Sequence, residues 1–320
     1  MPDFPVAQTL GVLELGILIS GVLFGVFTTQ VYIYYKNFPA ETLWIKAGLV
    51  GGMWLLELGH TICIFHAVYF YTVMTYGNPS AILQIPVSIG VGVAFHAIVI
   101  VMVQGYFAYR IARFGGRPYI LPIILCGQLL AQLVGVLTLS YKAITIATKS
   151  LEIYNRKWGW LIECTLCIRS AVDILTSCTL VFYLWKERSQ VFKKMTMIVD
   201  KLILWTIETG IVTSMLGIVL LIFYIVMPTN YVWLGLFMIL PKVYSNTMLA
   251  NMNSRADLRH TQSNVVMELG NTNFHLNSSR GASTKHFNIE VNTEVINTHD
   301  GLNGHSTWDG SVLPSKEVTI

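Results

Sequence analysis

The sequence predicts an all-α integral membrane protein: a bundle of seven transmembrane helices followed by a disordered C-terminal tail. Of its 320 residues, 54% are hydrophobic and only 12% are charged, which is about half the charge of an average soluble domain. The apolar runs fall almost entirely within residues 1–250, and the remainder is polar. The net charge of +4 is small and no basic-aromatic patch accompanies it, so we expect no nucleic-acid partner.

Seven apolar runs are long enough to cross a bilayer, because a helix needs about 20 residues to span a hydrocarbon core of ~30 Å. Connectors with turn-forming residues separate several of them, as in NFPAE, YGNPS, FGGRP and MPTN. Aromatic clusters at their ends suit the bilayer interface. After a short outer segment, 1–9, the predicted spans are 10–35, 45–73, 87–109, 119–141, 159–185, 202–226 and 231–252.

The lysine and arginine residues predict the orientation, because they accumulate in cytoplasmic loops. With the N-terminus outside, the inner segments carry twelve of these residues and the outer segments carry four. We therefore expect the N-terminus outside and the C-terminus in the cytoplasm, in either the plasma membrane or an endomembrane. The first run lacks a basic leader and a small-residue cleavage site, so we expect it to remain as an anchor.

The segment 253–320 is rich in Ser, Thr, Asn and His and poor in large apolar residues. This composition predicts a disordered cytoplasmic tail. The predicted loop between the fifth and sixth spans, 186–201, is basic and begins KERSQVFKKM. We expect the bilayer to be the main partner of the chain, and any cytosolic partner to contact this loop or the tail.

Ionisable residues inside the spans point to a structural or functional need, since each costs about 2.5–3.5 kcal/mol at the bilayer centre on insertion scales. Arg169 and Asp173 lie one turn apart on one face of the fifth span. Either they neutralise each other and fix this helix against its neighbours, or they form a polar pocket or relay. The predicted intramembrane polar network comprises Glu57, His60, Arg169, Asp173, Glu208 and Lys242.

No pattern in the sequence indicates a catalytic or metal site. Cys164 and Cys167 form a lone C-x-x-C within an apolar run, and His60 and His66 lack the spacing of a helical metal site. Neither a nucleophile elbow nor a Walker loop is present. We therefore expect no metal, no cofactor and no enzymatic activity. Lys242 in the last span raises a retinal Schiff base as a remote alternative, although the third span has no carboxylate to act as counter-ion.

The end of the last span, PKVYSNTMLANMNSR, resembles a signature in a basidiomycete fungal family of seven-helix proteins, catalogued as a domain of unknown function (DUF family 6534). Further similar segments extend the resemblance over about residues 10–260, and Glu57 stands where the family more often has aspartate. The resemblance implies a seven-helix fold with an inner tail, and no activity. The residues that match the terminal signature include Lys242, Tyr244, Asn246, Asn253 and Arg255.

Together these features favour a receptor-like protein that senses a ligand and reports it across the membrane. The alternative is a transporter or channel whose pathway is lined by the polar intramembrane residues. An odd number of spans and the lack of an obvious inverted repeat disfavour this alternative. An intramembrane hydrolase and a retinal-binding protein are remote alternatives, and the sequence identifies no ligand.

Overall fold

The protein is helical throughout the residues that the computed structural model describes. The structure describes residues 10–78, 84–115, 120–188, 193–227 and 232–278. No strand occurs in this part of the chain. The helical bundle belongs to one compact unit, Met1–Asn271.

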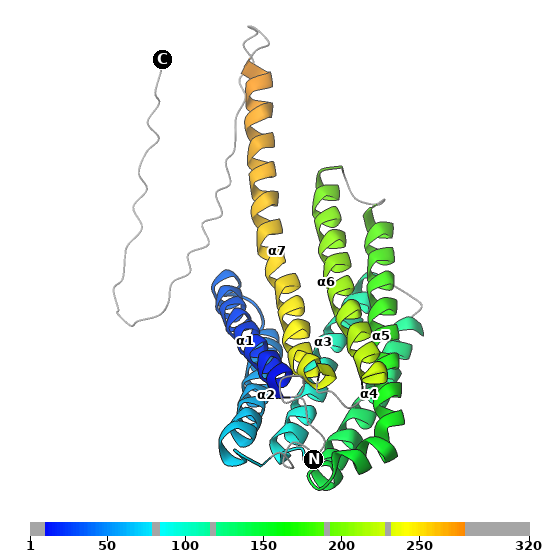
Figure 1. Ribbon diagram of the computed structural model, residues 1–320. Helices are drawn as coiled ribbons and strands as arrows, with labels where there is room; N and C mark the ends of the chain where they lie inside the picture. The colour runs from blue at the N-terminus through cyan, green and yellow to red at the C-terminus, as the bar shows by residue number, and fades with distance from the viewer. Residues whose placement is uncertain (1–9, 79–83, 116–119, 189–192, 228–231, 279–320) are drawn as a thin grey trace, which may run out of the picture. The chain divides into compact units, whose positions relative to one another are not determined.

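Seven long helices form the described fold (Figure 1). They are α1 (Val12–Asn37), α2 (Gly52–Tyr69), α3 (Val87–Gly115), α4 (Ile120–Lys142), α5 (Leu151–Arg188), α6 (Lys193–Val226) and α7 (Val232–Ser278). Short π-helical turns are continuous with two of these helices. They are η2 (Trp44–Gly51), which leads into α2, and η3 (Phe70–Met74) and η5 (Ala143–Ala147), which extend α2 and α4.

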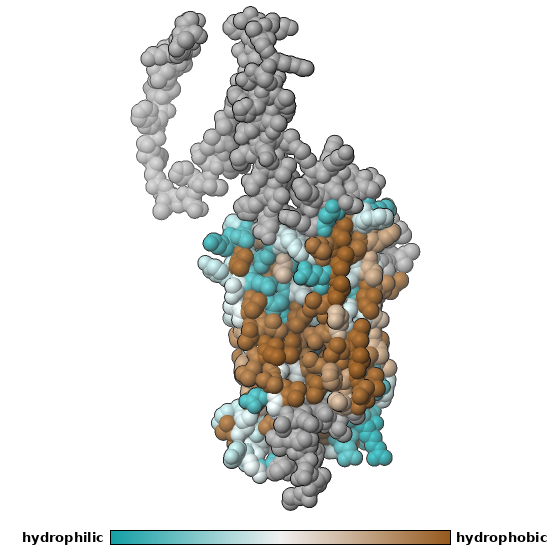
Figure 2. Space-filling model, turned by 45° about the horizontal axis from the view of Figure 1, so that its top comes forward, coloured by the Kyte–Doolittle hydropathy of each residue, from teal (hydrophilic) through white to brown (hydrophobic). Residues whose placement is uncertain are grey.

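Each of the seven helical segments is long and apolar enough to cross a membrane. Figure 2 shows a band of apolar residues across the middle of one face, with hydrophilic residues above and below it. Large apolar side chains such as Leu15, Leu55 and Ile123 are more than half exposed on the bundle. Such a surface is unsuited to water. The predicted class, an all-α integral membrane protein with seven spanning helices, is confirmed.

Successive helices run in opposite directions (Figure 1). We call the end at which α1 and α3 finish, and which α7 reaches at Arg255, the tail end. The other end contains the turn between α4 and α5, and we call it the opposite end. Only residues 148–150 separate η5 from α5. The connection between these two helices is therefore shorter than the interval 142–158 between the predicted fourth and fifth spans, because both helices continue beyond the predicted span ends.

Among the seven spans, α7 is the most deeply buried. In its most apolar stretch 67% of the residues are buried, against 28–50% for the other spans, although its mean hydropathy of 1.2 is the lowest. Side-chain hydrogen bonds join it to α1, α2, α3 and α5. A helix surrounded by other helices meets little lipid, so its polar residues find protein partners instead.

Glycines allow α1 and α7 to approach closely. A Cβ atom on Gly16 would lie only 2.7 Å from the Cα atom of Gly235. A Cβ atom on Gly235 would in turn lie 3.0 Å from the carbonyl oxygen of Val12. One turn further along α1, the hydroxyl of Ser20 donates a hydrogen bond of 3.1 Å to the carbonyl oxygen of Met238. Small residues thus bring the two backbones into direct contact.

The last helix extends beyond the predicted end of the seventh span. Whereas the sequence predicts a disordered tail from residue 253, α7 continues to Ser278. Residues 253–278 are polar but contain no proline, so every residue can continue the backbone hydrogen-bond ladder. The rest of the predicted tail, 279–320, lies outside the described residues.

Candidate functional site

Two buried polar networks meet on α7. Tyr244 belongs to a network with α3 and α5, and Lys242 belongs to a network with α2. Residues two apart on a helix point in directions that differ by about 200°. The pattern K-x-Y in α7 therefore supplies one polar side chain to each side of this central helix.

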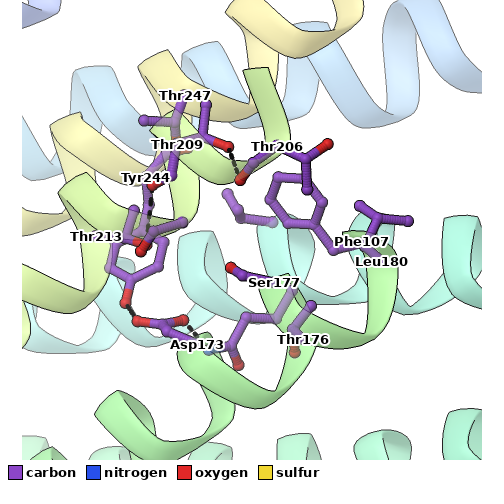
Figure 3. Close-up of a pocket in the computed structure, with 13 residues that line it drawn as sticks. Phe107, Asp173, Thr176, Ser177, Leu180, Thr206, Thr209, Thr213, Tyr244 and Thr247 are labelled. Carbon is purple, nitrogen blue, oxygen red and sulfur yellow. Dashed lines mark hydrogen bonds between the residues drawn. The ribbon is translucent and has the colours of Figure 1, made fainter. Parts of the chain in front are cut away.

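The Asp173 network comprises His96, Gln104, Arg169, Asp173 and Tyr244. The Tyr244 hydroxyl donates a hydrogen bond to Asp173 Oδ2, and Gln104 Nε2 donates to Asp173 Oδ1 at 3.3 Å (Figure 3). Asp173 is 6% exposed and Tyr244 is 2% exposed. The carboxylate thus receives one hydrogen bond from α7 and one from α3.

Arg169 and Asp173 make no direct hydrogen bond or ion pair in the described structure. Arg169 Nη1 instead donates to His96 Nε2 at 3.0 Å. Its guanidinium carbon lies 6.0 Å from the centroid of the Tyr244 ring. The i, i+4 spacing places both residues on one helical face, but the long arginine side chain extends towards α3. Tyr244 links the two residues, because its ring faces the guanidinium and its hydroxyl contacts the carboxylate.

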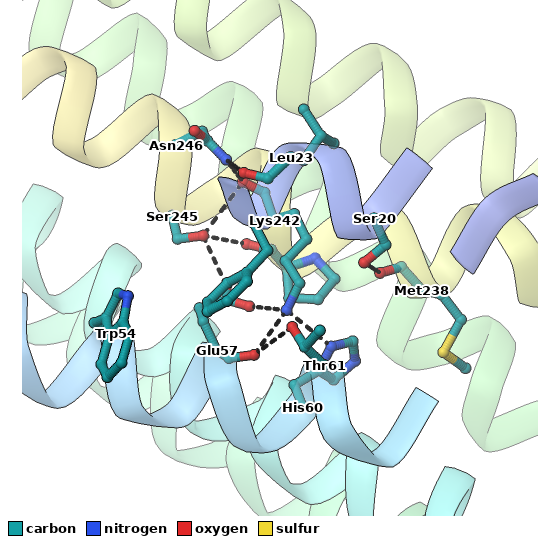
Figure 4. A network of polar contacts seen from close by, with 12 residues as sticks. Ser20, Leu23, Trp54, Glu57, His60, Thr61, Met238, Lys242, Ser245 and Asn246 are labelled. Atoms are coloured by element: carbon teal, nitrogen blue, oxygen red, sulfur yellow. Dashed lines mark hydrogen bonds and ion pairs between the residues drawn. The ribbon is translucent and has the colours of Figure 1, made fainter. Parts of the chain in front are cut away.

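The Glu57 network comprises Glu57, His60, Lys242 and Ser245 (Figure 4). All four residues are completely buried. Lys242 forms an ion pair with Glu57, and its Nζ atom also donates to the carbonyl oxygen of Glu57 at 3.0 Å and to His60 Nδ1 at 3.2 Å. An ammonium group has three donors, so each of them has an acceptor. Ser245 Oγ donates to the second carboxylate oxygen at 2.7 Å.

Asn246 extends the Glu57 network to α1. Its amide nitrogen donates to the carbonyl oxygens of Lys242, at 2.7 Å, and Leu23, at 3.0 Å. Its side-chain oxygen accepts a hydrogen bond from Gln30 Nε2 at 3.2 Å. Further along α7, Asn253 Nδ2 donates to the carbonyl oxygen of Gln30 at 3.0 Å. Residues of the predicted terminal signature thus fix α7 against α1 and α2.

Two histidines bring the networks together. The rings of His60 and His96 lie 6.3 Å apart in an edge-to-face arrangement, and His96 stacks on Phe237 at 4.3 Å. Among the described residues, His60 Nε2, His96 Nδ1 and Arg169 Nε have no hydrogen-bond partner. A buried polar group without a partner costs about 1–3 kcal/mol. The cluster of such groups marks this junction as a candidate functional site.

Two small cavities flank the junction. The Asp173 cavity, between α3, α5, α6 and α7, has a volume of about 30 Å³ and is lined by hydroxyl residues such as Ser177, Thr209 and Thr247 (Figure 3). The Arg169 cavity has a volume of about 60 Å³ and an almost wholly apolar lining that includes Trp233. Arg169 is the one charged residue among the residues described as lining it. The smaller cavity has room for about one or two water molecules.

Two wider cavities lie towards the tail end. The lateral cavity, between α1, α6 and α7, has a volume of about 510 Å³. The arginine cavity has a volume of about 720 Å³ and is lined by Arg110, Arg113 and Arg255. The lateral cavity shares Thr209 and Thr247 with the Asp173 cavity, and it shares Asn251 with the arginine cavity.

The structure brings five of the six predicted network residues to the two networks, and Glu208 is the exception. Glu208 is exposed and lines the lateral cavity. His96, Gln104 and Ser245 belong to these networks but are not among the residues predicted for the site. A lone histidine or glutamine in an apolar run carries little signal, because nothing nearby in the sequence shows what it faces. The position of Ser245 in the pattern K-x-Y-S of α7 could have indicated that it belongs to the site.

In the comparison with known proteins, one family model matches part of the chain. Residues 169–257 match the model described as "Family of unknown function (DUF6534)". The match includes Arg169, Asp173, Lys242 and Tyr244, and it confirms the predicted resemblance to a domain of unknown function. No curated protein and no solved structure matches the chain. The site geometry therefore carries the functional argument.

Proposed function

We propose that this protein is a membrane receptor in which α7 transmits ligand binding from one half of the bundle to the other. One observation carries the proposal: α7 contributes lining residues to all four cavities described above. It is also the helix shared by both polar networks. Packed helices switch between discrete arrangements rather than deform continuously, so a shift of α7 would change the networks and the cavities together.

The Arg169 cavity is the ligand site in this proposal. Arg169 is 2% exposed, and its Nε atom has no hydrogen-bond partner in the described structure. A guanidinium offers only donors, and apolar residues line the rest of the cavity. This chemistry suits an apolar molecule that ends in a carboxylate. The volume of about 60 Å³ is below the ~300–1,000 Å³ of ordinary ligand sites, so such a ligand has to displace Trp233 and Phe237 of α7.

The proposal places the opposite end outside and the tail end in the cytoplasm, as the distribution of lysine and arginine supports. A cytosolic partner would contact the tail end, at loop 186–201 or at the predicted tail. Most side chains of that loop lie outside the described residues. The proposal involves no catalytic step.

Dodecanoate is a suitable probe for this site. The protein, purified into phosphatidylcholine nanodiscs, is expected to show a saturable rise in unfolding temperature with dodecanoate and none with dodecanol, which lacks the carboxylate. Hydrogen–deuterium exchange is expected to change in α7 on the tail side of Lys242, away from the cavity.

A matched pair of substitutions separates binding in the cavity from insertion into the lipid. Ala143→Leu fills the Arg169 cavity, which Ala143 lines, and is expected to abolish the dodecanoate response. Ala171→Leu makes the same change at an exposed position of α5 and is expected to preserve it. An equal response to dodecanol, or an unchanged response in Ala143→Leu, would contradict the ligand site. Binding without any change in α7 exchange would contradict the receptor role.

A transporter is the second candidate, and a different observation favours it. The shared lining residues Thr209, Thr247 and Asn251 place three cavities in series from Asp173 to the tail end. The Arg169 cavity has no described lining residue in common with these three cavities. A transporter would carry protons into proteoliposomes that hold a pH-sensitive dye, and Asp173→Asn would stop the flux. The receptor proposal predicts no flux in the unmodified protein.

A further inference from the structure

We propose that the arginine cavity at the tail end binds a phosphate monoester, such as the headgroup of an anionic phospholipid. The cavity has a volume of about 720 Å³ and lies where the α1–α2 connection, α3 and α7 come together. This volume falls within the range of about 300–1,000 Å³ that is ordinary for a small-molecule site. The inference goes beyond the receptor proposal and does not depend on it.

Guanidinium groups from two helices converge on this cavity. Arg110 and Arg113 lie near the end of α3, and Arg255 lies on α7. The side chain of Arg255 is 37% exposed, and its Nη2 atom lies 3.7 Å from Glu41. Arg113 is exposed, and its Nη1 atom donates to the Tyr109 hydroxyl at 3.3 Å. Arginine is the side chain best suited to phosphate, because its planar fork offers paired donors.

Negatively charged side chains are scarce among the described residues that line the same cavity. Glu41 is the one carboxylate among the residues described as lining it, against three arginines. Asn251 adds a further donor: it is 2% exposed, its oxygen accepts a hydrogen bond from Arg110, and its Nδ2 atom has no partner in the described structure. A buried donor without an acceptor is costly. The excess of donors and of positive charge fits a ligand with several anionic oxygens.

The surroundings of the cavity fit a ligand that comes from the bilayer. Trp44 is 84% exposed and Tyr109 is 59% exposed, and both line the cavity. Exposed tryptophan and tyrosine are typical of the depth at which lipid headgroups lie. Basic pockets between membrane helices are known to accept anionic headgroups at that depth. The aromatic rings would contact the glycerol and upper acyl chains while the arginines bind the phosphate.

The test compares phosphatidic acid, whose headgroup is a phosphomonoester, with phosphatidylglycerol, whose headgroup is a diester. Each lipid is mixed with phosphatidylcholine in nanodiscs at proportions that give the same surface charge. Retention of lipid is read by native mass spectrometry, and stability is read by thermal unfolding. Preferential retention of phosphatidic acid, with a higher unfolding temperature, is the expected result. Glycerol phosphate added to phosphatidylcholine nanodiscs identifies a soluble ligand if it has the same effect.

Two substitutions and one control make the test specific. Arg113→Gln is expected to weaken apparent affinity for phosphatidic acid about tenfold, as for the loss of one charge-assisted contact. Glu41→Gln is expected to strengthen it, because Arg255 loses its carboxylate neighbour; a purely structural role would not produce an increase. Arg156→Gln removes an exposed charge near the start of α5, at the opposite end, and is expected to have no effect. Equal retention of both lipids, or equal losses in Arg113→Gln and Arg156→Gln, would overturn the proposal.

Discussion

At the scale of the residue, the feature that needs explanation is a fully buried lysine. Lys242 carries a charge into the interior of the bundle, where an uncompensated ion costs several kcal/mol. The structure compensates it completely: Glu57 supplies the opposite charge, and the remaining donors reach a carbonyl oxygen and His60. Ser245 occupies the second carboxylate oxygen. Such a pair joins α2 to α7 firmly only while both partners are present.

The first prediction concerns this pair. Lys242→Met leaves the Glu57 carboxylate buried without a counter-charge, and is expected to lower the free energy of unfolding by about 3–5 kcal/mol. Glu57→Gln combined with Lys242→Met is expected to recover more than half of the loss, because no unpaired charge remains. Unfolding by SDS in mixed micelles measures both. Lys36→Met, at an exposed position of α1, is the control, and a loss as large there would contradict the prediction.

The second prediction concerns the link between Tyr244 and Asp173. Tyr244→Phe removes the hydroxyl that donates to the carboxylate, and is expected to cost about 1–3 kcal/mol. Asp173→Asn is expected to cost less in the Tyr244→Phe background than in the unmodified protein, with a coupling of about 0.5–3 kcal/mol in a double-mutant cycle. Tyr224→Phe changes another buried tyrosine, on α6, as a control. Additive effects of the two substitutions would contradict the prediction, because they would show that the contact between Tyr244 and Asp173 contributes no coupling energy.

The sequence predicts those residues of the site that are energetically costly to place in a membrane span. It does not predict residues whose role depends on the direction in which a side chain points. Glu57, Arg169, Asp173 and Lys242 are predictable because a charge within an apolar span is costly wherever it points. Their partners are not, since a contact such as Arg169 with His96 joins residues 73 positions apart. The i, i+4 spacing correctly places Arg169 and Asp173 on one face, yet it does not determine the direction of a long flexible side chain.

At the scale of the element, hydropathy predicts that seven helices exist because each must bury its backbone polar groups in lipid. It does not predict where they end. The predicted fifth span begins at residue 159, whereas α5 begins at Leu151. Hydropathy reports the part of a helix that lies in hydrocarbon, and a helix continues wherever its backbone remains unblocked. Hydropathy likewise does not predict the central position of α7, because the mean hydropathy of this helix is the lowest of the seven.

The third prediction tests how α1 packs on α7. A Cβ atom on Gly16 would lie 2.7 Å from backbone atoms of Gly235, so Gly16→Ala has to push the two helices apart. We expect a loss of about 1–3 kcal/mol in the free energy of unfolding, as for an overpacked core. Gly25→Ala, on the same helix with nothing within 4 Å of the added Cβ atom, is expected to be neutral or slightly stabilising. Equal effects at both positions would contradict a close α1–α7 contact.

At the scale of the whole molecule, the ends of the described helices lie at one or the other end of the bundle. Lysine and arginine residues are distributed unequally between the two ends. At or beyond the tail end of the spans lie, among the residues that the structure describes, Lys36, Lys46, Arg110, Arg113, Lys186, Arg188, Lys193, Lys194, Lys201, Arg255 and Arg259. Towards the opposite end lie Lys142, Lys149, Arg156 and Lys157. Positive residues are retained on the cytoplasmic side during insertion, and the imbalance predicts that the tail end faces the cytoplasm.

The fourth prediction tests this orientation with two introduced cysteines. Ala40→Cys lies in the turn between α1 and η2, and Lys149→Cys lies in the turn between η5 and α5. In sealed vesicles with the cytoplasmic face outward, a membrane-impermeant maleimide is expected to label Ala40→Cys directly. It is expected to label Lys149→Cys only after detergent opens the vesicles.

The unmodified chain provides the background for this measurement, because its five cysteines are free and all lie within the spans. The reverse labelling pattern would place the arginine cavity on the outer side of the membrane. The phosphomonoester would then have to come from the outer leaflet, and a cytosolic partner could no longer reach the tail end. Equal labelling of both sites before detergent would show that the vesicles are leaky and would not report an orientation. A cysteine-containing control protein enclosed in the vesicles therefore has to remain unlabelled until detergent is added.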